Sequence, residues 1–138
     1  MLNERKLIML VDDDSVCNSI NTIYLQRRIA KECDLISFQS PLEALNYLSQ
    51  CFANSMYCKI LILLDINMPH MTGFDFIDEY KKFPEHKTEV IIDILTSSIN
   101  PVDIEKVKSN SAITDFILKP ITNGRADCLL EEMANSVN

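Results

Sequence analysis

The sequence predicts an α/β fold, a doubly wound, five-stranded parallel sheet with helices on both faces. Five short apolar runs alternate with segments of helical periodicity, and a charged or hydroxyl residue follows most of the runs directly. Apolar runs without polar alternation indicate strands that are buried on both faces. A strand–helix order repeated five times, with right-handed crossovers, then builds a parallel sheet covered on both sides.

The expected strands are the five apolar runs, and the fourth of them contains a carboxylate. The runs are Lys6–Val11, Leu35–Phe38, Ile60–Leu64, Val90–Leu95 and Phe116–Leu118. Asp93 lies inside the fourth run, where an apolar residue is expected, and a lone buried carboxylate is costly unless it is paired or protonated. Two explanations stay open: a local polar pocket, or a strand that is partly exposed at this point.

Helices are expected between the runs, where apolar residues recur every three or four positions. These residues are Val16, Ile20, Ile23 and Tyr24; Leu45, Leu48 and Phe52; Phe74, Ile77 and Tyr80; Ile104 and Val107; and Ala126, Leu129, Leu130, Met133 and Val137. Asp14, the capping box at 40–43 and Asn100 before a proline mark the starts of three helices. The segment Ser49–Lys59 is expected to be a surface loop.

Size, charge and cysteine usage restrict the class of protein. The 138 residues, 47 % of them hydrophobic, predict a single domain over 1–138. The net charge of −7 argues against a partner that is nucleic acid or an anionic membrane. No apolar stretch approaches the length of a membrane span, and no cleavable signal is present, so the protein is expected to be cytoplasmic. The five cysteines form no CxxC pair and are expected to be reduced.

Polar residues close four of the apolar runs. They are Asp12-Asp13-Asp14, Asp65, Thr96-Ser97-Ser98 and Lys119-Pro120. In an open parallel sheet, ligands bind beyond the carboxyl ends of the strands. These groups are therefore predicted to converge on one site.

The residue types at these strand ends indicate phosphoryl transfer. Asp12, Asp13 and Asp65 would place three carboxylates in one pocket, where they repel one another unless a divalent cation is present. Ligands that are all oxygen favour Mg²⁺ or Mn²⁺ over Zn²⁺. Lys119 adds a positive charge and Thr96 a hydroxyl donor, so the site would hold a nucleophile together with groups that stabilise the charge on a transferring phosphoryl group.

The chain resembles the receiver domains of two-component response regulators. The resemblance runs from about Lys6 to the last helix and rests on LIMLVDDD, LILLDINMPHMTGFDFI, IIDILTSS and DFILKP. The second segment is the most specific, because an Asp that closes an apolar strand is followed by Met68-Pro69 and then by Gly73. The resemblance implies a flavodoxin-like sheet of order 2-1-3-4-5.

The resemblance also implies a role for each acidic residue of the site. Asp65 matches the phosphoacceptor. Asp13 matches the carboxylate that binds Mg²⁺ directly, and Asp12 the one that acts through water. The backbone carbonyl of Asn67 matches a further metal ligand, and the side chains of Asn67 and Ser98 match positions that tune hydrolysis of the phosphoryl group.

Four further positions carry roles implied by the resemblance. Thr96 matches the hydroxyl residue that moves toward the phosphoryl group, and Phe116 matches the aromatic residue that switches with it. Lys119 matches the lysine that pairs with a phosphoryl oxygen. Lys119-Pro120 resembles the cis peptide of the family, and X–Pro bonds tolerate this isomer.

The implied function is a phosphorylation-dependent signalling switch. A sensor histidine kinase or a phosphotransfer protein would supply the phosphoryl group, and a protein effector would be contacted through the face of the fourth helix, fifth strand and fifth helix. The chain would catalyse only its own phosphorylation and dephosphorylation, which makes it a switch and not an enzyme with turnover. No DNA-binding module is expected after the last helix.

Three other interpretations compete with this one. A degenerate receiver that acts as a phosphorylation-independent interaction module is disfavoured by the intact Asp13, Asp65, Thr96 and Lys119. A flavodoxin-like cofactor binder needs a phosphate-cradling loop where this chain has three aspartates. A phosphatase of the haloacid-dehalogenase type would use two aspartates spaced like Asp12 and Asp14, but it would leave Asp65 unexplained.

Overall fold

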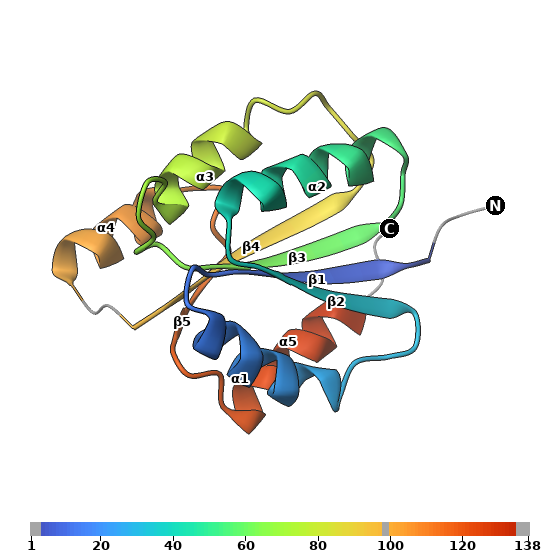
Figure 1. The fold of residues 1–138 in the computed structure, drawn as a ribbon, viewed down its shortest axis with the longest axis horizontal. Helices are drawn as coiled ribbons and strands as arrows, with labels where there is room; N and C mark the ends of the chain where they lie inside the picture. The colour runs from blue at the N-terminus through green and yellow to red at the C-terminus, as the bar shows by residue number, and fades with distance from the viewer. Residues whose placement is uncertain (1–3, 98–99, 135–138) are drawn as a thin grey trace.

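The computed structural model describes residues 4–97 and 100–134, which form five strands and five helices in alternation (Figure 1). The strands are β1 (Lys6–Val11), β2 (Cys33–Phe38), β3 (Lys59–Leu64), β4 (Glu89–Thr96) and β5 (Asp115–Leu118). The helices are α1 (Ser15–Gln26), α2 (Pro41–Ala53), α3 (Gly73–Tyr80), α4 (Pro101–Ser109) and α5 (Asn123–Ala134). All neighbouring strands pair in parallel in the order 2-1-3-4-5, which confirms the predicted fold class.

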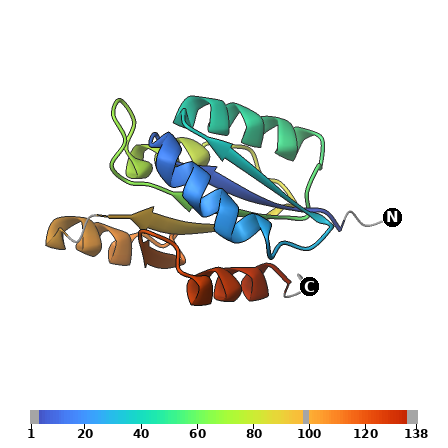
Figure 2. The ribbon, with the colours of Figure 1, turned by 60° about the horizontal axis from the view of Figure 1, so that its bottom comes forward.

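The helices divide between the two faces of the sheet (Figures 1 and 2). Residues of α1 and α5 pack with one set of strand side chains, and residues of α2, α3 and α4 pack with the other set. In β1, for example, Leu7 and Met9 join the second cluster while Ile8 and Leu10 join the first. Because both faces of the central strands are covered, their sequences are apolar without alternation.

The predicted helix starts agree with the structure. The side chain of Asp14 accepts a hydrogen bond from a backbone N–H in the first turn of α1, and Ser40 and Asn100 do the same for α2 and α4. Thr72 and Asp75 form a reciprocal capping box at the start of α3, which the sequence analysis missed. Each cap satisfies N–H groups that have no partner inside the helix.

Helix α1 is correctly predicted, but its apolar stripe faces solvent. The residues Val16, Ile20 and Ile23 are 62, 41 and 51 % exposed, whereas the buried side of the helix includes Asn18 and Asn21. Periodicity shows which residues share a face of a helix, but it does not show which face is covered. Here the asparagine face packs toward the sheet, and the apolar residues that indicated the helix lie on its exposed side.

One further expectation is wrong for part of its length, and one of the two explanations left open for Asp93 is excluded. The segment Ser49–Lys59 is a loop only over residues 54–58, because α2 continues through Ala53 and β3 begins at Lys59. Cys51 is completely buried in this last part of α2, which explains why the helix extends. The fourth strand is not exposed at Asp93, since this side chain has 0 % of its surface accessible. Val137, which was assigned to the last apolar stripe, lies outside the described residues.

Two lysines at the starts of β1 and β3 bind the last turn of α5. The Nζ of Lys6 donates to the carbonyl of Met133, and the Nζ of Lys59 donates to the carbonyl of Glu132, each at 2.6 Å. The last carbonyls of a helix lack partners within it and carry partial negative charge, so ammonium groups stabilise them. The N-terminal residues of β1 and β3 thereby fix the position of α5.

The five cysteines are all free thiols, as expected. Cys33 and Cys51 are buried, and burial raises the pKa of each thiol to about 11. These two groups therefore behave as small apolar residues. Within residues 4–97 and 100–134, no helix is both long enough and apolar enough to cross a bilayer.

Replacing Lys59 with Met tests the attachment of α5. Lys59 is 3 % exposed, and the substitution would leave the buried carbonyl of Glu132 without this donor. We expect the free energy of unfolding, measured by urea denaturation, to fall by about 1–3 kcal/mol. The exposed pair of Lys82 and Glu79 provides the control, because Lys82→Met should cost less than about 0.5 kcal/mol. Equal losses in both variants would contradict the attachment.

Candidate functional site

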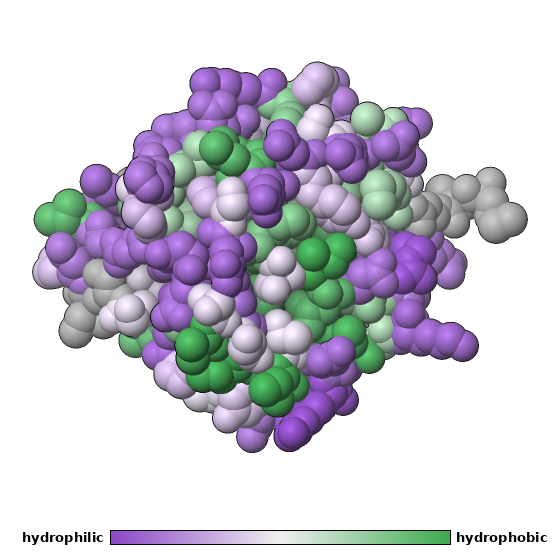
Figure 3. All heavy atoms as spheres, in the orientation of Figure 1, coloured by the Kyte–Doolittle hydropathy of each residue, from purple (hydrophilic) through white to green (hydrophobic). Residues whose placement is uncertain are grey.

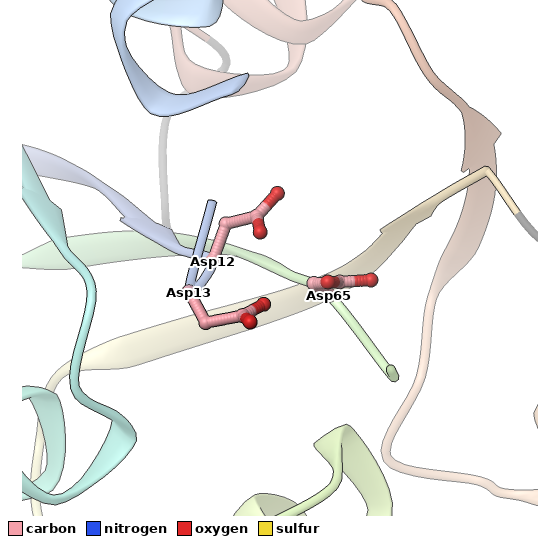
Figure 4. A group of neighbouring side chains, drawn as sticks. All are labelled: Asp12, Asp13 and Asp65. Carbon is pink, nitrogen blue, oxygen red and sulfur yellow. The ribbon is translucent and has the colours of Figure 1, made fainter. Parts of the chain in front are cut away.

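Three carboxylates meet where β1 and β3 end (Figure 4). Asp12 and Asp13 follow β1 directly, and Asp65 follows β3. One oxygen from each of the three side chains lies within 4.8 Å of the others. Asp12 and Asp65 are buried, whereas Asp13 is exposed. The structure thus brings together the three aspartates that the sequence predicted to converge.

Lys119 reaches the same place from the end of β5. Its Nζ forms an ion pair with Asp12 and lies 3.5 Å from an Oδ of Asp65. The other Oδ of Asp12 accepts a hydrogen bond from the backbone N–H of Asp14 at 2.9 Å. Lys119 therefore compensates the buried charge of Asp12 closely, whereas its contact with Asp65 is longer.

The electrostatic balance makes Asp65 the unusual acid of the site. Burial, with a further contribution from Asp12, raises the pKa of Asp65 to about 6 although Lys119 acts in the opposite direction. Burial alone would lower the pKa of Lys119, but the hydrogen bond from Lys119 to Asp12 and the charges of both aspartates raise it. Asp65 is thus a partly desolvated carboxylate beside a fixed positive charge.

Backbone hydrogen bonds continue past the strand ends and hold the loops of the site in register. The N–H of Asp65 donates to the carbonyl of Val11, and the N–H of Lys119 donates to the carbonyl of Thr96, at 3.0 and 2.9 Å. Each functional side chain is therefore attached to the sheet within two residues of its strand. This geometry requires a parallel sheet, because only there do consecutive strands end at the same edge.

Asn18 of α1 fastens the loop that carries Asp12 and Asp13. Its Nδ2 donates to the backbone carbonyl of Asp12 at 2.8 Å and to that of Phe38, at the end of β2, at 3.3 Å. The carbonyl of Asp12 belongs to the peptide group that joins Asp12 to Asp13, so this hydrogen bond fixes the orientation of that peptide group. The sequence analysis missed Asn18, and the only available signal was a polar residue on the less apolar side of a helix.

Gly73 allows α3 to begin directly against the backbone of Asp65. A Cβ atom at this position would lie 2.8 Å from the carbonyl oxygen of Asp65 and 2.9 Å from the Cα of Ile66. Real side chains do not tolerate such distances to backbone atoms. The glycine of the MPHMTG motif is therefore explained by a close approach of two backbone segments.

Among the remaining predicted residues, Asn67 contacts Asp65 and Thr96 ends the neighbouring strand β4. The backbone N–H of Asn67 donates to an Oδ of Asp65 at 3.3 Å, which orients this carboxylate. Thr96 is the last residue of β4 and is completely buried. Ser98 lies outside the described residues.

Phe116 and the Lys119–Pro120 peptide occupy β5 and the loop after it. Phe116 is half-buried and packs against the core cluster that includes α3 and α4 residues. The Lys119–Pro120 peptide bond is cis. The phenyl ring of Phe116 has no hydrogen-bonding group, so this side chain can influence the site only through packing.

The donor atoms of the site fit a hard divalent cation. Three carboxylates supply oxygen only, and none of the described histidine or cysteine side chains joins this group. Mg²⁺ and Mn²⁺ prefer such ligands. A cation here would also relieve the mutual repulsion of three neighbouring acids. Asp13 is the exposed member of the group, so its carboxylate is accessible to a hydrated ion from solvent.

Comparison with known proteins identifies relatives over most of the chain. The family described as "Response regulator receiver domain" matches residues 8–130. The cyclic di-GMP phosphodiesterase response regulator RpfG of Xanthomonas campestris pv. campestris is 30 % identical over 114 residues, 83 % of this chain but 28 % of RpfG. The two-component response regulator ORR13 of Oryza sativa subsp. japonica is 31 % identical over 114 residues, 83 % of this chain and 86 % of ORR13.

A solved structure gives the same assignment. A two-component response regulator from Cytophaga hutchinsonii superposes with a TM-score of 0.79 and 27 % sequence identity, covering 96 % of this chain and 99 % of that one. The chain spans about a quarter of RpfG, so similarity to RpfG concerns only the matching part.

Neutralising Asp65 should stabilise the metal-free protein. The folded pKa of about 6 lies above the ordinary value of an aspartate, so folding favours protonated Asp65 and stability falls as pH rises from about 4 through 6. In chelator at pH 7.5, Asp65→Asn should raise the free energy of unfolding by about 1–3 kcal/mol. This gain should shrink below pH 4.5. The exposed Asp78→Asn on α3 should change stability little at either pH, and a loss of stability in Asp65→Asn would contradict the electrostatic balance.

Proposed function

Because this chain belongs to the response regulator receiver domain family, we propose that it is a phosphorylation-dependent signalling switch. The phosphoryl group would be accepted by Asp65, and residues 1–138 would act as one receiver domain in the cytoplasm. The observation that carries the proposal is the position of Asp65, a buried carboxylate with two acids and a lysine around it. Five free thiols agree with a reducing compartment.

The carboxylate of Asp65 is the proposed nucleophile. One of its oxygens attacks the phosphorus of a phosphohistidine, an acyl phosphate bond forms, and the bond from phosphorus to the imidazole nitrogen breaks with the electron pair leaving on the imidazole. The hydrogen bond from the N–H of Asn67 restricts the rotation of the carboxylate. Hydrolysis of the acyl phosphate by water would reset the switch, with the side chains of Asn67 and Ser98 setting its rate.

Asp13, Asp65 and the backbone carbonyl of Asn67 would hold Mg²⁺, and Asp12 would contribute through water. The ion supplies charge neutralisation for the phosphoryl oxygens during transfer. Asp12 already pairs with Lys119, which places a positive charge beside this buried side chain. Lys119, 3.5 Å from Asp65, would pair with a phosphoryl oxygen once Asp65 is modified.

The switch is proposed to run from Thr96 to the face of α4, β5 and α5. The hydroxyl of Thr96 would move toward the phosphoryl group, and Phe116 would turn inward into the space that this movement leaves. Val102 of α4 and Leu118 of β5 are exposed large apolar residues on this face. A protein effector could bury both, so the face is the proposed output surface.

The exposed stripe of α1 is the proposed contact for the phosphodonor. Val16, Ile20 and Ile23 form an apolar surface over α1, visible as hydrophobic side chains in Figure 3. A pocket of about 240 Å³ next to this stripe is lined by Ile20 and, on the side of the site, by Lys119 and Pro120. A sensor histidine kinase or a phosphotransfer protein that covers the stripe would therefore lie next to Asp65.

A receiver that never takes a phosphate, acting only as an interaction module, is the competing proposal. It gives no reason for three carboxylates and a lysine to be held together at a cost in electrostatic free energy. The phosphodiesterase named in RpfG is a property of that longer protein. For this chain the proposed chemistry is confined to its own phosphorylation and dephosphorylation.

Acetyl phosphate provides a direct test of the acceptor. With Mg²⁺ present, the intact mass of the protein should increase by one phosphoryl group, and omission of the metal should abolish the increase. Asp65→Asn should give no increase, because the amide is a poor nucleophile. Asp78→Asn, on an exposed face, should be modified like the unchanged protein. A folded protein that gains no mass under any condition would favour the interaction module.

Ile20→Asp should separate the donor surface from the chemistry. The substitution places a charge on an exposed apolar position, so it should slow transfer from a phosphorylated histidine phosphotransfer protein at least tenfold. Modification by acetyl phosphate should remain within about twofold, since this small donor needs no docking surface. Val102→Asp, at a comparably exposed position of α4, should leave both rates unchanged. Equal slowing by both variants would refute a donor contact on α1.

A further inference from the structure

Asp93 is a completely buried carboxylate that the proposed phosphoryl chemistry does not use. It lies in the middle of β4, between Leu63 of β3 and Asp115 of β5 in the strand register. Its neighbours Ile91 and Leu95 belong to the core cluster of α1 and α5, so Asp93 points to the face that α5 covers. Neither of its Oδ atoms has a hydrogen-bond partner among the described residues.

The charged groups around Asp93 are mostly acidic. The charges of Glu132 of α5 and Asp115 of β5 disfavour a negative charge on Asp93, whereas Arg125 of α5 and the backbone N–H of Asp115 favour it. Arg125 is engaged, because it forms an ion pair with Asp115. Lys59 of β3, the next cation along the sheet, is bound to the carbonyl of Glu132 and lies 3.6 Å from Glu89 of β4.

One arginine therefore lies within reach of two carboxylates on adjacent strands. Asp93 and Asp115 are directly paired in the β4–β5 register, and neighbouring strands are about 4.8 Å apart. Arg125 and Glu132 occur seven residues apart, about two turns of α5, and so share one side of the helix. Arg125 thus acts on both carboxylates, on Asp115 through an ion pair and on Asp93 through its charge.

The protonation state of Asp93 determines whether Asp93 competes with Asp115 for Arg125. Burial, reinforced by Glu132 and Asp115, raises the pKa of Asp93 to about 7. A neutral Asp93 can remain beneath α5, whereas an ionised one would be an uncompensated charge in an apolar layer. The change would fall within the ordinary range of cellular pH.

We propose that Asp93 is a proton-sensing residue that couples pH to the packing of α5 on the sheet. When Asp93 is protonated, Arg125 pairs with Asp115 and α5 is firmly packed. When the proton is released to solvent, Arg125 is drawn from Asp115 toward Asp93, and α5 and β5 loosen. Both elements belong to the proposed output surface, but the coupling does not depend on phosphorylation of Asp65.

The direction of the effect follows from the two states of the chain. Asp93 of the unfolded chain ionises near the ordinary pKa of an aspartate, about 4, and in the folded protein its pKa is about 7. The folded state therefore binds the extra proton between these values, and stability falls as pH rises through this window. The loss levels off about one pH unit above the folded pKa, where Asp93 is almost fully ionised.

Hydrogen exchange of the α5 amides tests the proposal on the full chain. Between pH 6 and pH 8, after correction for the intrinsic exchange rate, protection of α5 should fall about tenfold or more in the unchanged protein. In Asp93→Asn, a neutral residue of the same shape, protection should change less than twofold. Asp78→Asn on α3 should behave like the unchanged protein. Equal pH dependence in Asp93→Asn and the unchanged protein would overturn the proposal.

A second measurement keeps the test decisive if Asp93→Asn does not fold. Carbon NMR of the carboxyl groups should show Asp93 titrating between pH 6 and 8 in the unchanged protein. In Asp115→Asn, Arg125 is released to pair with Asp93, so the midpoint should move down by about one pH unit or more. A carboxyl that stays in one form from pH 5.5 to 8.5, or a midpoint that Asp115→Asn leaves in place, would refute the mechanism.

Discussion

The concentration of like charge at the carboxyl edge of the sheet is the constraint on which the rest of the structure depends. Asp12, Asp13 and Asp65 are held within 4.8 Å of one another, and two of them are buried. Lys119 stabilises this group, because it pairs with Asp12 and contacts Asp65. Backbone N–H groups also donate to Asp12 and to Asp65. What remains uncompensated, chiefly the desolvated charge of Asp65, is what a cation and a phosphoryl group would use.

The surrounding fold supplies the rigidity that this arrangement needs. β1 and β3 are buried on both faces and end next to one another, so the two loops that carry the acids begin from fixed points. Asn18 fastens the first loop, and the close approach at Gly73 fastens the second. The site thus stands on the most buried part of the sheet, while the surfaces proposed for partners lie on α1 and on the α4–β5–α5 face, where apolar residues remain exposed.

One buried polar residue lies on α1 and another lies under α5, and the two respond differently to pH. Asn18 of α1 is neutral and donates to two backbone carbonyls, so it orders the site at any pH. Asp93, under α5, is ionisable and has no hydrogen-bond partner within the described part of the chain. Because Arg125 is already engaged with Asp115, we propose that the packing of α5 depends on whether Asp93 carries its proton. A phosphoryl signal and a proton signal would then meet on one output surface.

The sequence by itself determined the fold class, the strand positions and the four acidic and basic groups of the site, since uninterrupted apolar runs and the residues that close them are local features. It also identified the helix starts at Asp14, Ser40 and Asn100, because capping is a contact within one turn. Only the tertiary structure decided that Val16, Ile20 and Ile23 face solvent, that Lys6 and Lys59 hold the end of α5, and that Asp93 is buried opposite Asp115. These outcomes depend on which face of a helix is covered and on contacts between residues far apart in the chain, and periodicity contains neither.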